Sequence, residues 1–459
     1  MTTNESTFAF GPRPNRGYLG LSKVQIGSAI STATAAVVAM YVVGGVLGLP
    51  VGLGILSLGA LVTFTTRAGF PLLAWAPVVA RSLFRERVWL HSGPTAQGTA
   101  LALPKSLGKI DALAVPGSAW LDDAGAVGLI DVTAPTSFGL AGSGSRDTAT
   151  NGWATTLASL AEPGSLVSAV SWTVKVGPAD ADALPGWAVA NTAPDARADL
   201  VASYGELIAG AGPVGQHHVH TVAVRLRESR ATNRAAKLAG GIGPLVARES
   251  GRLASQLGDI GASAFPLSWA GGVRDRVVSH LDLLHPAQVA VPVVAMADEW
   301  DHVRVDSTYW RVLWVAEWPQ VPVQADFLSP LLLHCRAPRV VTLNVSAVSA
   351  DDASKSAERA SSGQESDVRV LAEAGVRVTA RRQRAMATTQ QREAELTSGH
   401  ALLRYSALVA VNAPDRAALE DYTAEVVAAA ASARLRLRVL YGRQAAALTA
   451  CLPMAKVTR

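Results

Sequence analysis

The feature that most constrains this 459-residue chain is a run of 43 residues, Val24 to Thr66, that contains no Asp, Glu, Lys, Arg or His. Lys23 and Arg67 bracket it. Because a bilayer core about 30 Å thick takes about 20 helical residues, the run predicts two membrane spans with a tight connection. We expect the first span at about Val24 to Val46 and the second at about Val51 to Thr66. The second is short, which implies tilt, local thinning or snorkelling by Arg67.

Glycine and proline mark the expected turn between the spans. Proline lacks the amide that a continuing helix needs, and glycine readily adopts the reversing dihedrals. Gly44 and Gly48 also stand in small-xxx-small register with Gly52, so these glycines either form a helix-packing face or only make the turn. The residues that mark the turn are Gly44, Gly45, Gly48 and Pro50.

Two other interpretations of the apolar run fit it less well. A secretory signal peptide has an apolar stretch of about 7 to 15 residues and then a cleavage site, and this run is much longer. A buried hairpin of a soluble protein would need a large apolar shell to cover both helices on all sides.

The net charge of +5 lies entirely in the first 90 residues. The remaining 369 residues sum to zero, so no basic surface large enough for nucleic acid is expected. Basic residues on both sides of the spans mark the cytoplasmic side, which places both termini and the large C-terminal body in the cytoplasm of a multi-pass plasma-membrane protein. The basic residues that set this topology are Arg13, Arg16, Lys23, Arg67, Arg81, Arg85 and Arg87.

Pro71 to Leu90 mixes apolar side chains with three arginines. That composition suits a helix lying in the lipid headgroup region, and it equally suits an amphipathic linker helix. The overall composition, 49 % apolar and 17 % charged, is typical of a globular protein with some membrane-embedded length. The two cysteines, Cys335 and Cys451, exclude a disulfide framework or a four-cysteine zinc site.

Beyond a Gly, Pro and Ser-rich passage from Ser92 to Gly108, apolar β-type runs alternate with Ala-rich helical runs. The expected strands are Val127 to Val132, Leu166 to Val176, Val219 to Leu226, Tyr309 to Trp318, Val340 to Val345, Leu402 to Val411 and Leu435 to Tyr441. The expected helices are Trp153 to Leu160, Ala196 to Ile208, Ala231 to Leu257, Val323 to Leu333, Asp352 to Leu396 with a break near Ser361 to Gly363, and Pro414 to Ser432.

This rhythm predicts an α+β fold whose cytoplasmic body consists of two ferredoxin-like α/β sandwich halves, with a parallel α/β sheet as the alternative. The divide is expected in the loop-rich stretch from Leu284 to Asp301. The predicted organisation is a basic N-terminal segment (1–23), a transmembrane hairpin (24–66), a juxtamembrane helix and linker (67–108), a first half (109–290) and a second half (291–459).

No common catalytic motif is present in the sequence. A P-loop needs a glycine five residues before its Gly-Lys pair and Ser or Thr after it, but Gly108-Lys109 is preceded by Leu103 and followed by Ile110. Nucleophile elbows, zinc helices of the HExxH type and a complete dinucleotide fingerprint are also absent. We therefore expect neither an enzyme of these classes nor a cofactor.

Three weaker groups of residues carry alternatives. His217, His218 and His220 open a predicted strand, where His218 and His220 share a face and could belong to a metal site or be ordinary edge-strand histidines. Asp301, His302 and Asp306 could transfer protons or simply satisfy a loop that enters the sheet. The basic cluster Arg381, Arg382, Arg384 and Arg392 fits a solvated helix face better than a nucleic-acid site.

Short motifs spread over the chain resemble a family of actinobacterial membrane proteins that occur with conjugal-transfer, type IV secretion-like gene sets. The resemblance runs from near residue 8 to near residue 454 and depends on the order and spacing of the motifs. They are Phe10-Gly11-Pro12-Arg13 with Arg16-Gly17, the double span, His91-Ser92-Gly93-Pro94, Trp300-Asp301-His302 with Asp306-Ser307, Arg339 to Leu343, Ala433 to Leu437, Tyr441 to Ala447, and Leu452-Pro453.

The layout also resembles a small two-span inner-membrane subunit fused to the N-terminal part of the large conjugation ATPase. The chain stops shortly after Leu452-Pro453, about where an ATPase domain would begin. The resemblance therefore implies a non-catalytic scaffold or docking component that contacts the ATPase and channel subunits and can form an oligomer within the apparatus. It supplies no catalytic residues. Its structural or docking residues would be Trp300, Asp301, His302, Asp306, Tyr441 and Gln444.

Two rival functions are compatible with this plan. The E-type membrane subunit of type VII secretion also has two spans followed by a cytosolic body. A membrane-tethered enzyme would use the cluster of Asp301, His302 and Asp306.

Overall fold

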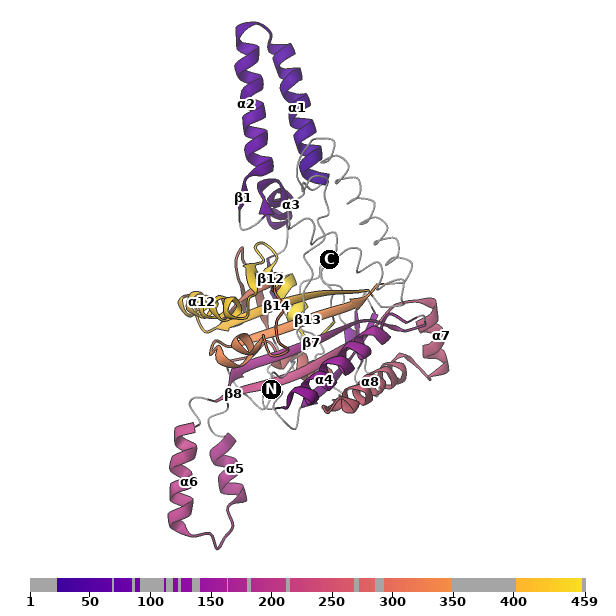
Figure 1. Cartoon of the computed structure of the whole chain (residues 1–459), viewed down its shortest axis with the longest axis vertical. Helices are drawn as coiled ribbons and strands as arrows, with labels where there is room; N and C mark the ends of the chain where they lie inside the picture. Colours follow the sequence, from indigo (N-terminus) through magenta and orange to yellow (C-terminus); the bar gives the residue numbers. More distant parts are fainter. Residues whose placement is uncertain are drawn as a thin grey trace, which may run out of the picture. The chain divides into compact units, whose positions relative to one another are not determined.

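The computed structural model describes residues 23–67, 70–84, 87–90, 111–112, 119–122, 125–133, 141–162, 164–179, 183–211, 215–267, 272–284, 293–348 and 402–455. They fall into two compact units: a helical unit that contains the apolar run, and a sheet-containing body (Figure 1). The expected helix from Asp352 to Leu396 and the arginine cluster within it lie outside the described residues, as do Arg13, Arg16 and Arg85.

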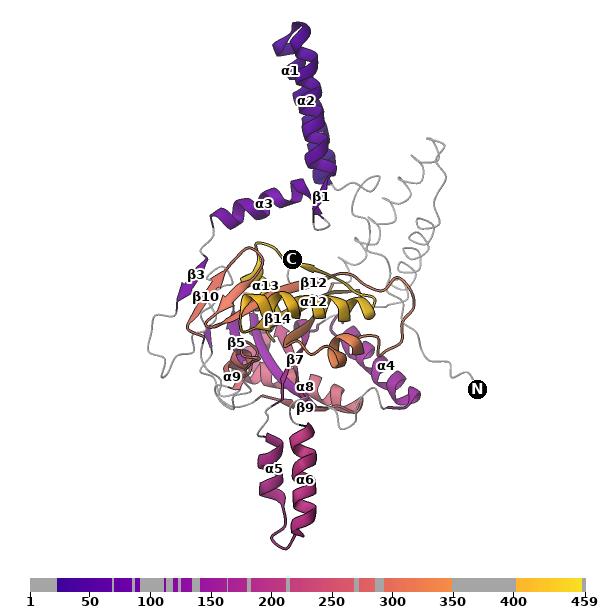
Figure 2. The same ribbon diagram turned by 90° about the vertical axis from the view of Figure 1, so that its left-hand side faces the viewer.

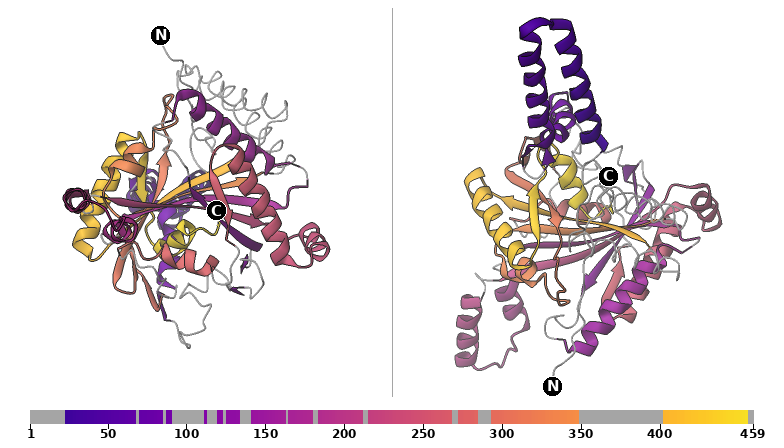
Figure 3. Two further views of the ribbon diagram at one scale, coloured as in Figure 1. Left: turned by 90° about the horizontal axis from the view of Figure 1, so that it is seen from below. Right: turned by 45° about the horizontal axis from the view of Figure 1, so that its top comes forward.

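The helical unit is built around two antiparallel apolar helices, α1 (Lys23–Val43) and α2 (Gly45–Phe64) (Figure 3). Both are long and apolar enough to span a membrane. The expected turn is confirmed at Gly44 and Gly45, whose φ angles are 58° and 59°. It is wrong for Gly48 and Pro50, which lie inside α2. The second helix is consequently 20 residues long, so the short second span and its compensating tilt are not needed.

Glycines let the two helices approach closely. A Cβ added at Gly48 would lie 2.7 Å from the carbonyl oxygen of Met40, and one added at Gly52 would overlap Cγ of Met40. At the open end, Oγ of Ser28 and Oγ1 of Thr63 are 2.8 Å apart. Gly48 and Gly52 therefore form a packing face, and Gly44 makes the turn.

A short helix follows the hairpin. The strands β1 (Thr66–Arg67) and β2 (Phe70–Pro71) pair antiparallel and lead into α3 (Leu72–Leu83). The expected amphipathic helix from Pro71 to Leu90 is thus shorter than predicted, because β3 (Val88–Leu90) pairs with a strand of the body instead (Figure 2).

The body is a mixed helix and sheet structure whose described strands all pair antiparallel, which excludes the parallel alternative. The first half contains β4 (Asp111–Ala112), β5 (Ala119–Asp122), β6 (Gly125–Thr133), α4 (Ser143–Ser159), β7 (Val167–Pro178), α5 (Ala183–Asn191), α6 (Ala198–Ala211), β8 (Gln216–Leu226), α7 (Arg230–Leu238), α8 (Ile242–Asp259), β9 (Ser263–Pro266) and α9 (Gly272–Ser279). The second contains β10 (Ala295–Asp298), β11 (Val303–Val305), β12 (Thr308–Glu317), η4 (Pro330–His334), β13 (Arg339–Ala347), β14 (Leu403–Ala413), α12 (Arg416–Ser432), β15 (Arg436–Val439) and α13 (Gln444–Cys451).

The two halves share one topology. In the first, the spatial strand order is β9-β6-β8-β7, and in the second it is β15-β12-β14-β13. Each half also has a short strand, β5 or β11, directly before β6 or β12. This strand pairs with the first part of β6 or β12, and β9 or β15 pairs with the rest of the same edge. The halves join edge to edge through β7 and β13, from Arg339 opposite Val176 to Ser346 opposite Ala169.

Three hydrophobic clusters cover the faces of this sheet. One face packs against α4 and α8 in the first half, and against α12 and the segment around η4 in the second (Figure 3). The other face packs against α9, α13 and the chain end up to Ala455. Buried Arg225 holds that end in place by donating to the carbonyl oxygens of Met454 (2.6 Å) and Ala455 (3.1 Å).

All seven expected strands are present, but three expected helices differ. The helix from Ala231 to Leu257 is interrupted at Gly240 and Gly241, whose positive φ angles a continuing helix cannot contain. The region from Val323 to Leu333 forms turns and the π-helix η4. Helix α4 begins ten residues before the expected start at Trp153.

Candidate functional site

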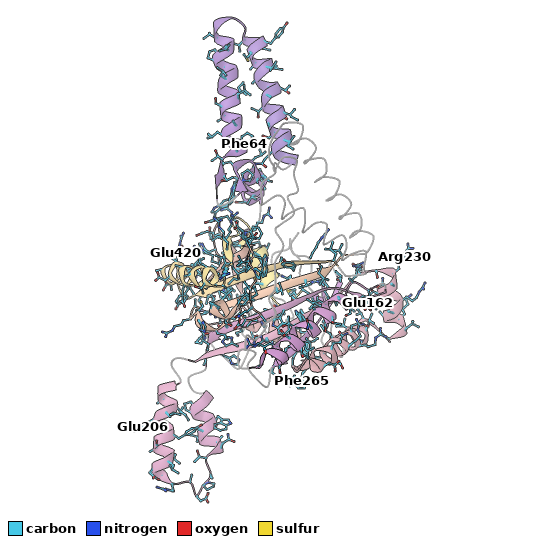
Figure 4. All side chains as sticks on the ribbon, in the orientation of Figure 1. Phe64, Glu162, Glu206, Arg230, Phe265 and Glu420 are labelled. Atoms are coloured by element: carbon cyan, nitrogen blue, oxygen red, sulfur yellow. The ribbon has the colours of Figure 1, made fainter. Side chains whose placement is uncertain are left out.

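The loop that carries Asp301 and His302 is held by a buried arginine of strand β12. Arg311 is 5 % exposed and donates to Oδ2 of Asp301 and to both carboxylate oxygens of Glu420, each at 2.7 Å. Glu420 lies on α12 (Figure 4). Its Nε also donates to the backbone oxygen of Asp301 at 3.1 Å. Nδ1 of His302 lies 2.9 Å from Oδ1 of Asp301 and donates to it. The acid and histidine are therefore parts of one structural network.

The charges in this network stabilise one another. Burial raises the pKa of Asp301, but the hydrogen bond from His302 and the charge of Arg311 outweigh it and hold this pKa below its usual value. The hydrogen bond from Arg311 lowers the pKa of Glu420, and the one to Glu420 raises the pKa of Arg311. Asp301 is therefore an ionised ion-pair partner, and a proton-transfer role would require it to leave Arg311.

Asp306 has a separate structural role. It lies in the turn between β11 and β12 with φ 49°, and its Oδ1 accepts hydrogen bonds from the amides of Val294 (3.1 Å) and Ala295 (2.7 Å). Asp is among the residues that tolerate this left-handed conformation. Asp306 thus fixes the start of β10 and does not meet Asp301 or His302 in any hydrogen bond of the described residues.

Trp300, Tyr441 and Gln444 join the same loop to α13. The rings of Trp300 and Tyr441 stack with centroids 6.2 Å apart, and the amide of Gly442 donates to the oxygen of Trp300 at 2.6 Å. The fully buried side chain of Gln444 accepts from the amide of Val312 (2.7 Å) and donates to its oxygen (3.2 Å). It completes the β12 edge between the residues paired with β11 and those paired with β15.

Among the described residues, the three histidines of β8 belong to no cluster that could hold a metal ion. No group of three or more His, Cys, Asp or Glu in the described part of the chain is arranged to hold a metal ion. Nδ1 of His220 lies 3.4 Å from the indole nitrogen of Trp172, which donates to it. Burial lowers the pKa of all three, that of His218 to about 4, so they are neutral at neutral pH.

A buried polar cluster on β7, β6 and α9 was not expected from the sequence. Lys175 donates to the backbone oxygens of Ser279 (2.5 Å) and Asp282 (2.9 Å), and burial lowers its pKa to about 8. Arg276 pairs with Asp131, and Nδ1 of the fully buried His280 donates to the oxygen of Arg276 at 2.7 Å. These bonds attach α9 to the sheet. The feature of the sequence that could have indicated this cluster is a single lysine inside the expected apolar strand from Leu166 to Val176.

Arg339, the first residue of β13, also directs its side-chain hydrogen bonds to backbone groups. It is fully buried and donates to the oxygens of Leu331, Leu332, Cys335 and Ala337 at 2.6 to 2.9 Å. The last carbonyls of a helix have no partner within it, so Arg339 satisfies the end of η4.

Of the residues expected to set membrane topology, Lys23 lies in α1, Arg67 in β1 and Arg81 in α3, and Arg87 immediately precedes β3. The comparisons add no assignment to this geometry: no model of a protein family matches the sequence, and a search of curated proteins found no match.

Proposed function

We propose that the chain is a non-catalytic, membrane-anchored scaffold or docking component of an actinobacterial conjugative, type IV secretion-like apparatus. The observation that carries the anchoring is the α1 and α2 hairpin. Its helices pack on each other through glycine and leave apolar side chains exposed along their length, a surface that water-soluble proteins rarely present and lipid would cover. The exposed residues include Val37, Val38, Val42, Leu47, Leu49, Leu53, Leu58, Leu61 and Phe64.

The non-catalytic assignment is supported by the hydrogen bonds that the candidate catalytic side chains make within the protein. The side chains of Asp301, His302, Asp306 and Gln444 are each hydrogen-bonded to a neighbouring residue or strand of the body. In this proposal the body is a pair of ferredoxin-like halves in the cytoplasm, supported by the strand order that each half repeats. The partners are a conjugation ATPase and channel subunits, supported by the sequence resemblance alone.

Crosslinking mass spectrometry on membranes of the native host, with a tagged copy of the protein, tests this function. Crosslinks from residues 196 to 441 to a transfer ATPase would support a docking subunit and identify the half that holds it. Recovery of a type VII secretion ATPase would overturn the assignment in favour of the rival apparatus. Crosslinks confined to the protein itself or to unrelated enzymes would favour the tethered enzyme, and loss of the protein in a carbonate wash of the membranes would refute anchoring.

A further inference from the structure

The helical hairpin between β7 and β8 exposes more apolar surface than it buries. Among residues 185 to 210, on α5, α6 and their connection, Ile208 is the one buried side chain. Leu200, Tyr204 and Leu207 on α6 are 59 %, 46 % and 68 % exposed. Two helices this short gain little stability without tertiary packing. These properties are typical of a helical hairpin that packs against a partner surface.

Helix α6 presents an apolar row beside an acidic one. Leu200, Tyr204 and Leu207 follow the i, i+4, i+7 spacing that places side chains on one helix face. Asp199 and Glu206 each precede a leucine of that row by one position and are seven residues apart. At about 1.5 Å per residue, the two carboxylates lie about 10 Å apart along the helix.

Helix α7 has the matching arrangement with the opposite charge. Arg230, Arg234 and Lys237 follow the same i, i+4, i+7 spacing, are all exposed, and form no ion pair with another described residue. Ala231 and Leu238 each follow a basic residue by one position, and Leu238 is 86 % exposed. Arg230 and Lys237 are seven residues apart, as are Asp199 and Glu206. Figure 4 labels Arg230 on α7 and Glu206 on α6.

Helices α6 and α7 of one chain lie at opposite ends of β8 (Figure 1). The hairpin is attached to β8 at Gln216, and α7 begins four residues after the other end of this strand, Leu226. The 11 residues of β8 span about 36 Å, while the 14 residues of α6 reach about 21 Å. The complementary faces therefore belong to opposite ends of the strand.

We propose that α6 of one copy docks antiparallel on α7 of a second copy, so that the protein assembles head to tail. Asp199 then faces Lys237, Glu206 faces Arg230, and the row of Leu200 and Leu207 packs beside Leu238. The exposed ion pair between Asp199 and Arg197, the residue before α6, is weak enough to exchange. A contact between two different surfaces closes into a ring or continues as a filament. The acidic rim of α6 disfavours an anionic lipid surface as the partner. The contact holds whether or not the proposed function is correct.

Charge reversal tests the contact in the full-length protein in detergent, by light scattering after size-exclusion chromatography. Wild-type protein is expected to assemble at low salt. The D199K/E206K and R230E/K237E variants should each shift the midpoint concentration of assembly at least tenfold upward. An equimolar mixture of the two should assemble again, because each supplies the charge that the other lacks. The matched control D259K/D421K changes the same charge at exposed positions away from α6 and should assemble as wild type does.

A second pair of substitutions leaves the charges in place. L200S/L207S alters exposed side chains, so the fold should survive, which circular dichroism checks, while assembly weakens. A monomeric wild type, charge-reversed variants that still assemble, or a mixture that stays monomeric would each overturn the proposal.

Discussion

Gly261 and Arg434 occupy the same position in the two halves of the body. Each follows the C-cap of the long helix, α8 or α12, and each has a left-handed backbone, with φ 88° and 58°. In both places the next amide donates back to a carbonyl five residues earlier, from Ala262 to Leu257 and from Leu435 to Ala430. The repeated topology thus extends to a single turn, which one half makes with glycine and the other with arginine.

Replacing Arg434 with glycine should stabilise the protein. A left-handed conformation costs a residue with a Cβ about 1 kcal/mol, and glycine adopts it freely. The exposed arginine side chain has no hydrogen bond within the described residues, so the Arg434→Gly protein should melt at a higher temperature in a thermal unfolding scan. Ala433→Gly is the control: Ala433 is buried with φ −78°, and glycine there should lower the melting temperature.

Removing Arg311 should destabilise the protein near neutral pH and matter less in acid. Arg311→Met leaves the Asp301 carboxylate without its buried partner, at a cost of about 2 to 4 kcal/mol. The pKa of Asp301 and that of Glu420 are lowered in the fold, so their stabilisation is present above about pH 4 and is lost as the pH falls through the folded pKa values. The gap between wild type and variant in chemical denaturation should therefore narrow below about pH 4.

The matched control for Arg311 is Arg438→Met. Arg438 pairs with Glu317 at 3.2 Å, but that carboxylate side chain is 50 % exposed. An exposed pair contributes about 1 kcal/mol or less. Equal losses in the two variants would show that the Asp301 network has no special role in stability.

Lys175 should make the protein more stable at alkaline pH. Its folded pKa is about 8, below the unfolded value of about 10.4, so between these pH values the unfolded chain binds more protons. Wild-type stability should therefore rise by roughly 2 kcal/mol relative to Lys175→Met as the pH increases from 8 to 10. Urea unfolding at several pH values measures this, with the exposed Lys237→Met as a control that should follow wild type. Parallel curves for wild type and Lys175→Met would contradict the burial argument.

A methyl group at Gly48 should force α1 and α2 apart. The added Cβ would meet the backbone oxygen of Met40, which cannot move aside as a side chain can. A disulfide between Ser28→Cys and Thr63→Cys, whose hydroxyl oxygens are 2.8 Å apart in the native protein, should form several-fold more slowly in the presence of Gly48→Ala. Gly54→Ala is the matched control, because a Cβ there meets no atom within 4 Å. Equal disulfide rates would show that the helices do not pack through Gly48.

The sequence predicted the long central strands, such as β7 and β14, because each is a run of mostly apolar residues. It did not predict β3, β10 or β11, which are three or four residues long and depend on pairing with neighbours from distant parts of the chain. The first ten residues of α4 were not predicted to be helical because they are mostly polar and small, with little apolar periodicity.

The candidate site was predicted in part. The sequence pointed to Asp301, His302 and Gln444. It did not point to Arg311 and Glu420, which form the ion-pair network that holds Asp301 and, through it, His302. Glu420 looks like any exposed helical acid, since its partner is 109 residues away in sequence. Arg311 could have been found from the sequence. It is the one charged residue in the interior of the expected strand from Tyr309 to Trp318 except for Glu317 near its end, and a charge in a buried strand needs an ion-pair or hydrogen-bond partner.

The backbone pairing between β7 and β13 holds the two halves together independently of the covalent chain. Eight residue pairs join these strands, so separating the halves would uncover two bare strand edges at the centre of the sheet. A single proteolytic cut between residues 284 and 293 should therefore leave both fragments together through native purification and separate them only in denaturant. We expect the covalent connection between the halves to be dispensable once the protein has folded.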